Sequence, residues 1–348
     1  MTASQVRFGI IGCGEIAVQT CQGIAAASNA SISFLMDERP EVLKDLAEFY
    51  GVPTTTNLDE LLSSSEVDAV YIATPHDLHA PLGIRAAQAG KHVLVEKPIA
   101  TTLADADALI AACREHGVTL SVAYHAQVDA AMAAARDLIR AGVLGKIIAV
   151  RMTALSDKPD HYWHGGYTRR VQTDWRALKA RSGGGILIMN LIHDLNTVRW
   201  VTGLEVARVY AEYGTLATHV EVEDTIAVTL RYDNDAIGMI QAGSAMRGGA
   251  YQDVRGPRIY GTRGQIILAD KPLIYLLDPS EGGQPKTWQE LRFSGAPGDR
   301  QRMVERFAAA ILEKREPPVT GLDGRKALEI AVAAYRSGEL HQPVTLPL

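Results

Sequence analysis

The chain has few cysteines, no long apolar run and no excess of positive charge, and each shortage excludes a class of protein. Its three cysteines, Cys13, Cys21 and Cys113, cannot all pair, and none has the spacing of metal ligands. They indicate free thiols in a reducing compartment. No apolar run approaches the roughly 18 residues of a membrane-spanning helix. A strand pattern already begins by Val6, where a signal peptide would have its apolar stretch. The sequence therefore predicts a cytoplasmic protein without a membrane partner.

The charge balance and the composition narrow the class further. Forty acidic and 35 basic residues give a net charge of -5, so no overall positive field attracts nucleic acid. Hydrophobic residues make up 47% and charged residues 22% of the 348 residues, which excludes a disordered chain. At roughly 150 residues per domain, the length predicts about two domains. We expect a globular enzyme that acts on a small molecule.

Strand-like and helix-like segments alternate in the first third of the chain. The helix-like segments carry cap residues such as Asn57 or end at glycines such as Gly51 and Gly90. Six strands interleaved with helices predict an α/β domain with a parallel, doubly wound sheet of the Rossmann type at residues 1–123. Five of these strand-like runs occupy 6–11, 32–36, 69–73, 92–95 and 119–123.

Beyond residue 123 the alternation stops. A helix-like segment at 130–141, a strand-like run at 147–155 and an aromatic, glycine-rich loop at 159–185 lead into a helix that ends near Trp200. The pattern predicts an α+β domain at 124–348 with an open, largely antiparallel sheet. Its further strands are expected at 206–213, 225–232, 236–242, 258–260 and 265–268, with a closing helix near 325–335.

The first strand ends in a glycine turn that can hold phosphates. Gly12 permits the tight turn, and Gly14 lets a pyrophosphate approach bare backbone. The phosphates would lie at the N-terminus of the following helix, which begins with Glu15 and Ile16. Glycine-rich turns are common, so the pattern alone also fits a purely structural turn. Its position between a strand and a helix favours dinucleotide binding.

An acidic residue at the end of the second strand indicates which dinucleotide would bind. Asp37 lies 25 residues after Gly12 and would accept hydrogen bonds from ribose hydroxyls and repel a 2′-phosphate. It favours NAD as the cofactor. Arg39 is able to bind a 2′-phosphate, so NADP stays open as an alternative, and Arg39 also fits a solvated turn.

Besides the glycine turn, the sequence has motifs at 73–79, 90–98, 174–176, 182–193 and 318–337, and Glu96-Lys97-Pro98 is the most specific of them. In order along almost the whole chain, these motifs resemble the Gfo/Idh/MocA family of oxidoreductases. The resemblance implies an N-terminal Rossmann domain that binds a nicotinamide cofactor, and a second domain against which sugars, inositols or related polyols are oxidised or reduced. It also implies a homodimer or homotetramer formed through the exposed face of the second domain's sheet.

Two residues are the candidates for catalysis. Lys97 follows a parallel strand at the edge where such sheets bind ligands, and an ammonium there would stabilise charge on an oxygen that loses its proton. The resemblance identifies Lys97 as the family's site lysine and Glu96 as the neighbour that orients it. It also identifies His193 as the catalytic histidine, although a histidine on a helix is often a core residue.

The sequence departs from the family pattern four residues before His193. Many members carry an aspartate there, and this chain has Met189. Asn190 can form hydrogen bonds but takes no proton, and Asp194 would point about 100° away from His193 around the helix. The predicted acid-base set is therefore reduced to Lys97 and His193.

The resemblance also implies further contacts with the cofactor and the substrate. An alternative for the aromatic residues is that they anchor a long loop to the core, and an alternative for His79 is that it caps or packs. The family often has asparagine where this chain has His76. The predicted cofactor contacts are Thr74, Pro75, His76, His79, Glu96, Lys97 and His125, and the predicted substrate contacts are Lys97, Tyr124, Trp163, Arg176, Asn190 and His193.

Three functions fit these motifs. The leading hypothesis is an NAD(P)-dependent dehydrogenase or reductase that acts on a CH-OH group of a sugar, inositol or related polyol. A second is a glycosidase that retains NAD and oxidises the sugar transiently. A third is a non-catalytic NAD-binding sensor, which the loss of the aspartate at Met189 keeps open. No metal site is predicted.

Overall fold

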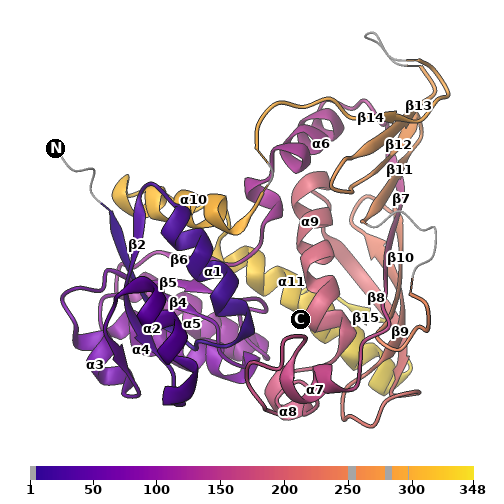
Figure 1. The fold of residues 1–348 in the computed structure, drawn as a ribbon. Coiled ribbons are helices and arrows are strands. Elements are labelled where there is room, and N and C mark those ends of the chain that lie inside the picture. Colours follow the sequence, from indigo (N-terminus) through magenta and orange to yellow (C-terminus); the bar gives the residue numbers. More distant parts are fainter. Residues whose placement is uncertain (1–4, 250–255, 279–283, 297) are drawn as a thin grey trace. The chain divides into compact units, whose positions relative to one another are not determined.

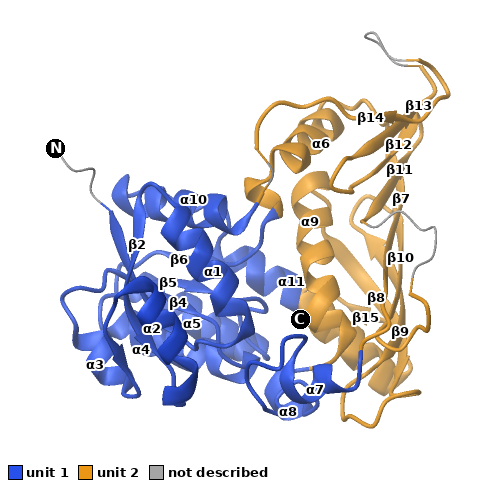
Figure 2. Ribbon diagram, in the orientation of Figure 1, with its two compact units in different colours: residues 1–125, 159–183, 299–328 blue, residues 126–158, 184–298, 329–348 orange. Residues whose placement is uncertain are grey.

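The contacts within the chain divide it into two units, which Figure 2 shows in blue and orange. The computed structural model describes residues 5–249, 256–278, 284–296 and 298–348. Unit 1 comprises residues 1–125, 159–183 and 299–328, and unit 2 comprises 126–158, 184–298 and 329–348. The boundary predicted after residue 123 stays a prediction. The limits of the two units differ from this predicted boundary because two later segments, 159–183 and 299–328, group with the N-terminal residues.

Unit 1 contains a six-stranded parallel sheet in the order β3-β2-β1-β4-β5-β6 (Figure 1). The predicted parallel, doubly wound sheet is thereby confirmed. Most residues of its central strands are apolar and buried, because helices cover both faces of such a sheet. The strands are β1 (Val6–Ile11), β2 (Ala30–Met36), β3 (Thr54–Thr55), β4 (Ala69–Ile72), β5 (His92–Val95) and β6 (Leu120–Val122).

The helices of unit 1 flank this sheet. Right-handed crossovers carry the chain outward in opposite directions from β1 and β4, so α1 lies on one face, and α4 and α5 lie on the other. α10 packs against α1 although the two are far apart in the sequence. The helices are α1 (Glu15–Ala26), η1 (Pro40–Val42), α2 (Lys44–Tyr50), α3 (Leu58–Ser63), η2 (His76–Leu78), α4 (His79–Gln88), α5 (Leu103–Glu115), α7 (His161–Gly165), α8 (Lys179–Ser182) and α10 (Arg300–Leu312).

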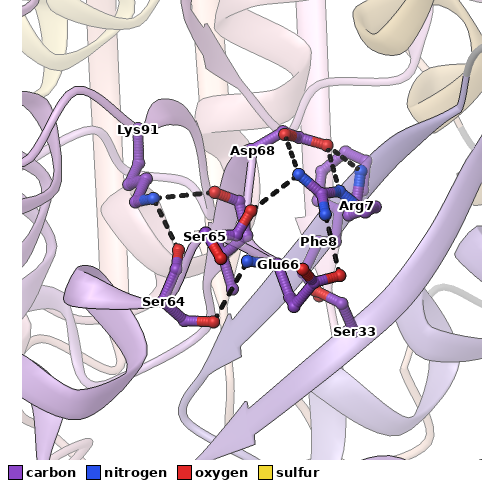
Figure 3. Close-up of polar contacts among 9 residues, drawn as sticks. Arg7, Phe8, Ser33, Ser64, Ser65, Glu66, Asp68 and Lys91 are labelled. Atoms are coloured by element: carbon purple, nitrogen blue, oxygen red, sulfur yellow. Dashed lines mark hydrogen bonds and ion pairs between the residues drawn. The ribbon is translucent and has the colours of Figure 1, made fainter.

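A polar cluster fastens the amino edge of the sheet (Figure 3). Arg7, on β1, donates through Nε and Nη2 to the carboxylate of Asp68 at 2.9 and 2.8 Å, and its Nη1 lies 2.8 Å from Glu66. The hydrogen bonds from Arg7 lower the pKa of Asp68. Lys91 donates to two main-chain carbonyls of the loop before β4. The cluster therefore connects the amino ends of β1, β4 and β5, and the carboxyl edge of the sheet stays open to ligands.

Unit 2 contains a nine-stranded sheet in the order β14-β13-β12-β11-β7-β10-β9-β8-β15. Only β7 and β10 pair in parallel, so the predicted, largely antiparallel sheet is confirmed. Three short strands, β13 to β15, have no counterpart in the prediction. The strands are β7 (Ile147–Leu155), β8 (Val206–Gly214), β9 (Thr225–Tyr232), β10 (Ile237–Gly243), β11 (Arg258–Gly261), β12 (Gly264–Ile267), β13 (Leu273–Leu276), β14 (Gln289–Glu290) and β15 (Val344–Thr345).

The helices of unit 2 lie on one side of its sheet. Figure 2 shows α6 and α9 on the same side, and these two helices pack against each other. Along β8, β9 and β10, buried residues alternate with exposed ones, as in a sheet with one covered face. Among the described helices, none is long and apolar enough to cross a membrane. The helices are η3 (Ala126–Val128), α6 (Ala130–Arg140), η4 (Leu187–Leu191), α9 (Ile192–Thr202) and α11 (Gly321–Leu340), which begins in unit 1.

Candidate active site

The glycine turn between β1 and α1 has the geometry of a phosphate site. Gly12 has φ of 87°, and a Cβ atom there would lie 2.9 Å from the side chain of Thr74. A Cβ atom on Gly14 would meet nothing closer than 3.9 Å, so a ligand has room to approach this backbone. Gly14 is the N-cap residue of α1 and has no side chain that could accept a hydrogen bond from the first amides of the helix. The first amides of the helix, at Glu15 and Ile16, therefore have no capping side chain and are available to an anion.

Asp37 is held directly beside this turn. The residue is buried, and its Oδ2 accepts the main-chain N–H of Cys13 at 2.8 Å. Its Oδ1 accepts the N–H of Arg39 at 3.0 Å and lies 3.4 Å from Arg39 Nε. A carboxylate offers about four acceptor sites, so Asp37 keeps capacity for a ribose hydroxyl. The ion pair turns Arg39 toward Asp37.

A buried hydroxyl at the end of β4 also suits a dinucleotide. Thr74 Oγ1 has no hydrogen-bond partner among the described residues, and its side chain lies next to Gly12. A buried polar atom without a partner is costly unless a ligand satisfies it. The open backbone at Gly14, the uncapped helix α1 and this hydroxyl together fit a bound dinucleotide. Within the described ranges, no group of three or more His, Cys, Asp or Glu side chains is arranged to hold a metal ion.

The histidines after β4 are engaged by the protein itself. Pro75 caps η2, and the His76 ring packs against the Trp175 ring at a tilt of 59°, with 4.6 Å between their centres. His76 Nδ1 lies 2.8 Å from the Ser182 carbonyl. Burial lowers the pKa of His76 well below its usual value. His79 Nδ1 lies 2.6 Å from the Pro98 carbonyl, and its Nε2 lies 3.0 Å from the Thr74 carbonyl. His79 thus links two loops at the carboxyl edge, which favours the packing alternative for it.

Lys97 follows β5 and rests on a buried carboxylate. Glu96 Oε1 accepts hydrogen bonds from the Tyr71 hydroxyl at 2.6 Å and from Arg300 Nη1 at 3.0 Å, and Oε2 accepts the N–H of Lys97 at 3.3 Å. Burial acts to raise the pKa of Glu96, but the charges of Arg300 and Lys97 outweigh it and the pKa is lowered. Lys97 is half-buried, and the Lys97–Pro98 peptide bond is cis. A charged carboxylate therefore sits behind the predicted catalytic lysine.

Two further predicted residues follow β6. Tyr124 is buried, and its N–H donates to the Val122 carbonyl at 2.7 Å. Burial lowers the pKa of His125, and the nearby charge of Arg300 lowers it further. A neutral His125 beside Glu96 and Lys97 is compatible with the predicted cofactor contact, which stays a prediction.

Residues 166–170, which we name the strap, are fastened over the glycine turn within unit 1. The carboxylate of Glu15 accepts the N–H groups of Tyr167 and Thr168 at 3.1 and 3.0 Å. Arg170 Nε donates to the Cys13 carbonyl at 2.9 Å, and its guanidinium pairs with both oxygens of Asp45 at 2.6 Å. No sequence motif identifies Arg170, because its partners Cys13 and Asp45 lie more than 100 residues before it in the chain.

The aromatic loop contributes two predicted substrate residues. Trp163 is buried and meets the Tyr162 ring edge-on at 5.3 Å, which favours the anchoring alternative for it. The guanidinium of Arg176 lies 4.6 Å from the centre of the Trp175 ring and 3.8 Å from Glu15 Oε2. Arg176 thus lies at the start of α1, beside the glycine turn. Its predicted contact with substrate stays a prediction.

In unit 2, a glycine run begins the helical segment that carries His193. A Cβ atom on Gly185 would lie 1.9 Å from the Glu223 carbonyl oxygen, so only glycine fits there. The Glu223 carboxylate accepts the N–H groups of Gly185 and Leu187 at 2.5 and 3.0 Å and the Tyr335 hydroxyl at 2.9 Å. Burial raises the pKa of Glu223. This carboxylate holds the start of η4, a π-helical stretch that continues into α9.

The residues around His193 differ in their exposure. Met189 is buried, His193 is half-buried and Asn190 is exposed. Asn190 Oδ1 accepts a hydrogen bond from Lys158 Nζ at 2.7 Å, and Lys158 is only 4% exposed. Burial raises the pKa of Asp194 to about 7. No motif in the sequence marks Lys158 or gives a role to Asp194, because helical spacing alone shows neither that Lys158 is buried nor that the carboxyl group of Asp194 is desolvated.

Comparisons with known proteins agree with the geometry. Residues 6–124 match the model of the oxidoreductase family with an NAD-binding Rossmann fold, and residues 132–267 match the GFO/IDH/MocA C-terminal domain. The chain is 29% identical to the 1,5-anhydro-D-fructose reductase of Ensifer adhaerens, over 97% of each chain.

Two solved structures resemble the chain over nearly its whole length. One is the aldose-aldose oxidoreductase of Caulobacter crescentus complexed with glycerol, with 29% identity, a TM-score of 0.84 and coverage of 98% of this chain and 100% of that chain. The other is the WlbA dehydrogenase of Bordetella pertussis in complex with NADH and UDP-GlcNAcA, with 26% identity, a TM-score of 0.83 and coverage of 100% of this chain and 99% of that chain. The chain therefore belongs to the Gfo/Idh/MocA family of oxidoreductases, and its N-terminal part is an NAD-binding Rossmann domain.

Proposed function

We propose that this enzyme oxidises or reduces a hydroxyl-bearing carbon of a sugar, inositol or related polyol. The observation that carries the proposal is Lys97, half-buried at the carboxyl end of β5 with the buried Glu96 carboxylate behind it. The named relatives that act on sugars support the substrate class. The bound nicotinamide supplies the hydride exchange, and the residues of the chain supply binding and proton handling.

Lys97 and His193 handle the proton of the substrate hydroxyl in this proposal. The ammonium of Lys97 stabilises charge on the substrate oxygen when the proton leaves. Glu96, which Arg300 and Tyr71 hold in place, fixes the main chain of Lys97 through its N–H. His193 exchanges the proton with the substrate hydroxyl.

We further propose NAD in preference to NADP. Asp37 is fixed next to the glycine turn by the N–H of Cys13, where its charge repels a 2′-phosphate. Arg39 forms an ion pair with that same carboxylate, which engages its guanidinium. Comparison of the two cofactors under equal conditions checks this preference.

A second candidate function, a reaction that retains the cofactor through every turnover, is favoured by the strap. Glu15 and Arg170 fasten this segment across the glycine turn, and such a cover slows the release of a bound dinucleotide. An NAD-retaining glycosidase is one reaction of this kind. It predicts cofactor that survives dialysis and no net formation of NADH with sugar.

The proposal is tested by the absorbance of reduced nicotinamide when the protein meets sugars, inositols and sugar acids, first with NAD and then with NADP. We expect the band to grow with at least one substrate, and Lys97→Met to lower kcat by about 100-fold or more because charge stabilisation on the oxygen is lost. The matched control is Lys146→Met, which removes an exposed lysine of unit 2.

Each outcome has a definite meaning. Full activity in Lys97→Met contradicts the assigned role. A silent panel, in protein shown by mass spectrometry to hold cofactor, favours the cofactor-retaining candidate if a glycoside is cleaved. A silent panel without cleavage favours a sensor that binds NAD without chemistry.

A further inference from the structure

A buried lysine fixes the orientation of an exposed amide one helical turn before His193. Lys158 lies beyond the end of β7, where its N–H donates to the Ser244 carbonyl at 2.7 Å. η4 packs against β7, and this brings Asn190 to Lys158. Lys158 Nζ then donates to Asn190 Oδ1 at 2.7 Å. All of these residues belong to unit 2.

The chemistry of the two groups decides which side of the amide faces outward. An ammonium has only donors, so the atom of Asn190 that meets it is the carbonyl oxygen Oδ1. The Nδ2 group with its two N–H donors is therefore turned away from Lys158. Within the described part of the chain, the side chain of Asn190 makes no second hydrogen bond, and the residue is exposed. The helix thus presents a fixed donor pair at its surface.

The charges around this amide favour an anionic acceptor. The ammonium of Lys158 lies directly behind it, and charge-assisted hydrogen bonds are stronger than neutral ones. The acidic residue next to Lys158, Asp157, is paired with Arg247 at 2.6 Å. Asp194 has its pKa raised to about 7 by burial, so a large part of it is uncharged near neutral pH.

We propose that Lys158 is a positioning residue that orients the amide of Asn190, and that Asn190 Nδ2 binds a carboxylate oxygen of the substrate. The substrate class is then a sugar acid, such as an aldonate or a uronate. This inference rests on the proposed oxidoreductase function and narrows its substrate.

The test compares matched pairs of neutral and acidic substrates, D-glucose with D-gluconate and D-glucuronate, and D-galactose with D-galacturonate. In Asn190→Asp a carboxylate oxygen replaces the outward NH2 group of the amide, and this oxygen repels the carboxylate of an acidic substrate. We expect the KM for the preferred acid to rise by about tenfold or more, with kcat changed far less, because one charge-assisted hydrogen bond is lost. The KM for the neutral partner should rise less than the KM for the acid, since the neutral substrate has no carboxylate for the new oxygen to repel.

A second variant tests the positioning role of Lys158. Lys158→Met keeps the length of the side chain but removes the ammonium that fixes the amide. We expect the KM for the acid to rise several-fold and the affinity for NADH, measured by fluorescence, to stay unchanged. Lys146→Met, at an exposed lysine of the same unit, is the matched control. Asn190→Asp keeps the inference testable if Lys158→Met does not fold.

Direct binding separates this inference from the proposed function. The melting temperature of each variant is measured with and without D-gluconate, D-glucuronate and D-galacturonate in the presence of NAD. Stabilisation of the natural protein but not of Asn190→Asp supports the inference even if no substrate turns over, in which case only the proposed function fails. Equal KM and equal stabilisation in both proteins, preference for the neutral sugars, or no binding of any acid overturns the inference.

Discussion

Burial changes the acidity of Asp194 more than its position on a helix suggests. An exposed aspartate has a pKa near 4, and burial raises the pKa of Asp194 to about 7. The unfolded chain therefore releases this proton at a lower pH than the folded chain does. Because the folded pKa of an acid is raised, the folded state loses stability as pH rises from about 4 to 7.

We expect Asp194→Asn to be more stable than the natural protein at pH 8 and equally stable at pH 4. The difference is bounded by about 4 kcal/mol, since each tenfold change in acidity corresponds to about 1.4 kcal/mol. Denaturant unfolding at pH 4, 6 and 8 measures it. The control is Asp233→Asn, at an exposed turn. A difference that does not vary with pH would show that the carboxyl group of Asp194 titrates normally.

Single residues were predictable from the sequence where their chemistry depends on near neighbours. The glycine turn and Glu96-Lys97 are short motifs, and the structure has them at strand ends as expected. Lys158 meets Asn190 across 32 positions and Arg300 meets Glu96 across 204 positions. No local pattern marks such partners, because the fold alone brings them together.

The strap is the element whose mobility should control the cofactor. Arg170 joins it to the Cys13 carbonyl and to Asp45, while Glu15 holds its main chain. We expect Arg170→Ala to speed the dissociation of NADH by about three- to tenfold, because the four hydrogen bonds of its guanidinium to Cys13, Val42 and Asp45 are lost and the bonds to Glu15 remain. Stopped-flow displacement of NADH measures the rate.

The matched control for the strap is Arg114→Ala, which removes an exposed arginine in the last turn of α5. An unchanged dissociation rate in Arg170→Ala would mean that the strap does not limit release. The cofactor-retaining candidate would then lose its supporting observation. A rise of similar size in both variants would instead point to a general effect of charge.

Elements were predictable in proportion to the length and regularity of their patterns. Strands 6–11, 92–95 and 147–155 were predicted with the bounds that the structure shows. β14 and β15 have two residues each, too few for any alternation to show. The sequence analysis also missed α10, which belongs to unit 1 although it lies beyond the antiparallel strands. Its place depends on contacts with α1 rather than on the residues near it.

At the scale of the whole molecule, the chain passes between its two units several times. The segments 159–183 and 299–328 group with unit 1. The strap forms hydrogen bonds to Glu15, and Arg300 forms one to Glu96, so both of these later segments contact the candidate site. The end of the strand-helix alternation marks only the first passage, because no local pattern shows that the two later segments pack with unit 1.

The uncovered face of the sheet in unit 2 carries apolar side chains. Met239 on β10 is 58% exposed, Ile148 on β7 is 48% exposed and Tyr210 on β8 is 38% exposed. Thr229 on β9 pairs with both Met239 and Tyr210, so one row of the outward face runs across three strands. Apolar side chains gathered on one open sheet face are typical of an interface between protein chains.

We therefore expect a homodimer or homotetramer that forms through this face, with Met239 in the interface. Met239→Lys places a charge in the row between Tyr210 and β7 and should dissociate the assembly, because burying an unpaired ammonium costs several kcal/mol. Size-exclusion chromatography with light scattering measures the mass of each protein. Phe49→Lys is the control, since Phe49 is an equally apolar, 79% exposed residue on α2 of unit 1.

A stable monomer in the natural protein contradicts the expectation. An unchanged assembly in Met239→Lys moves the interface away from this face.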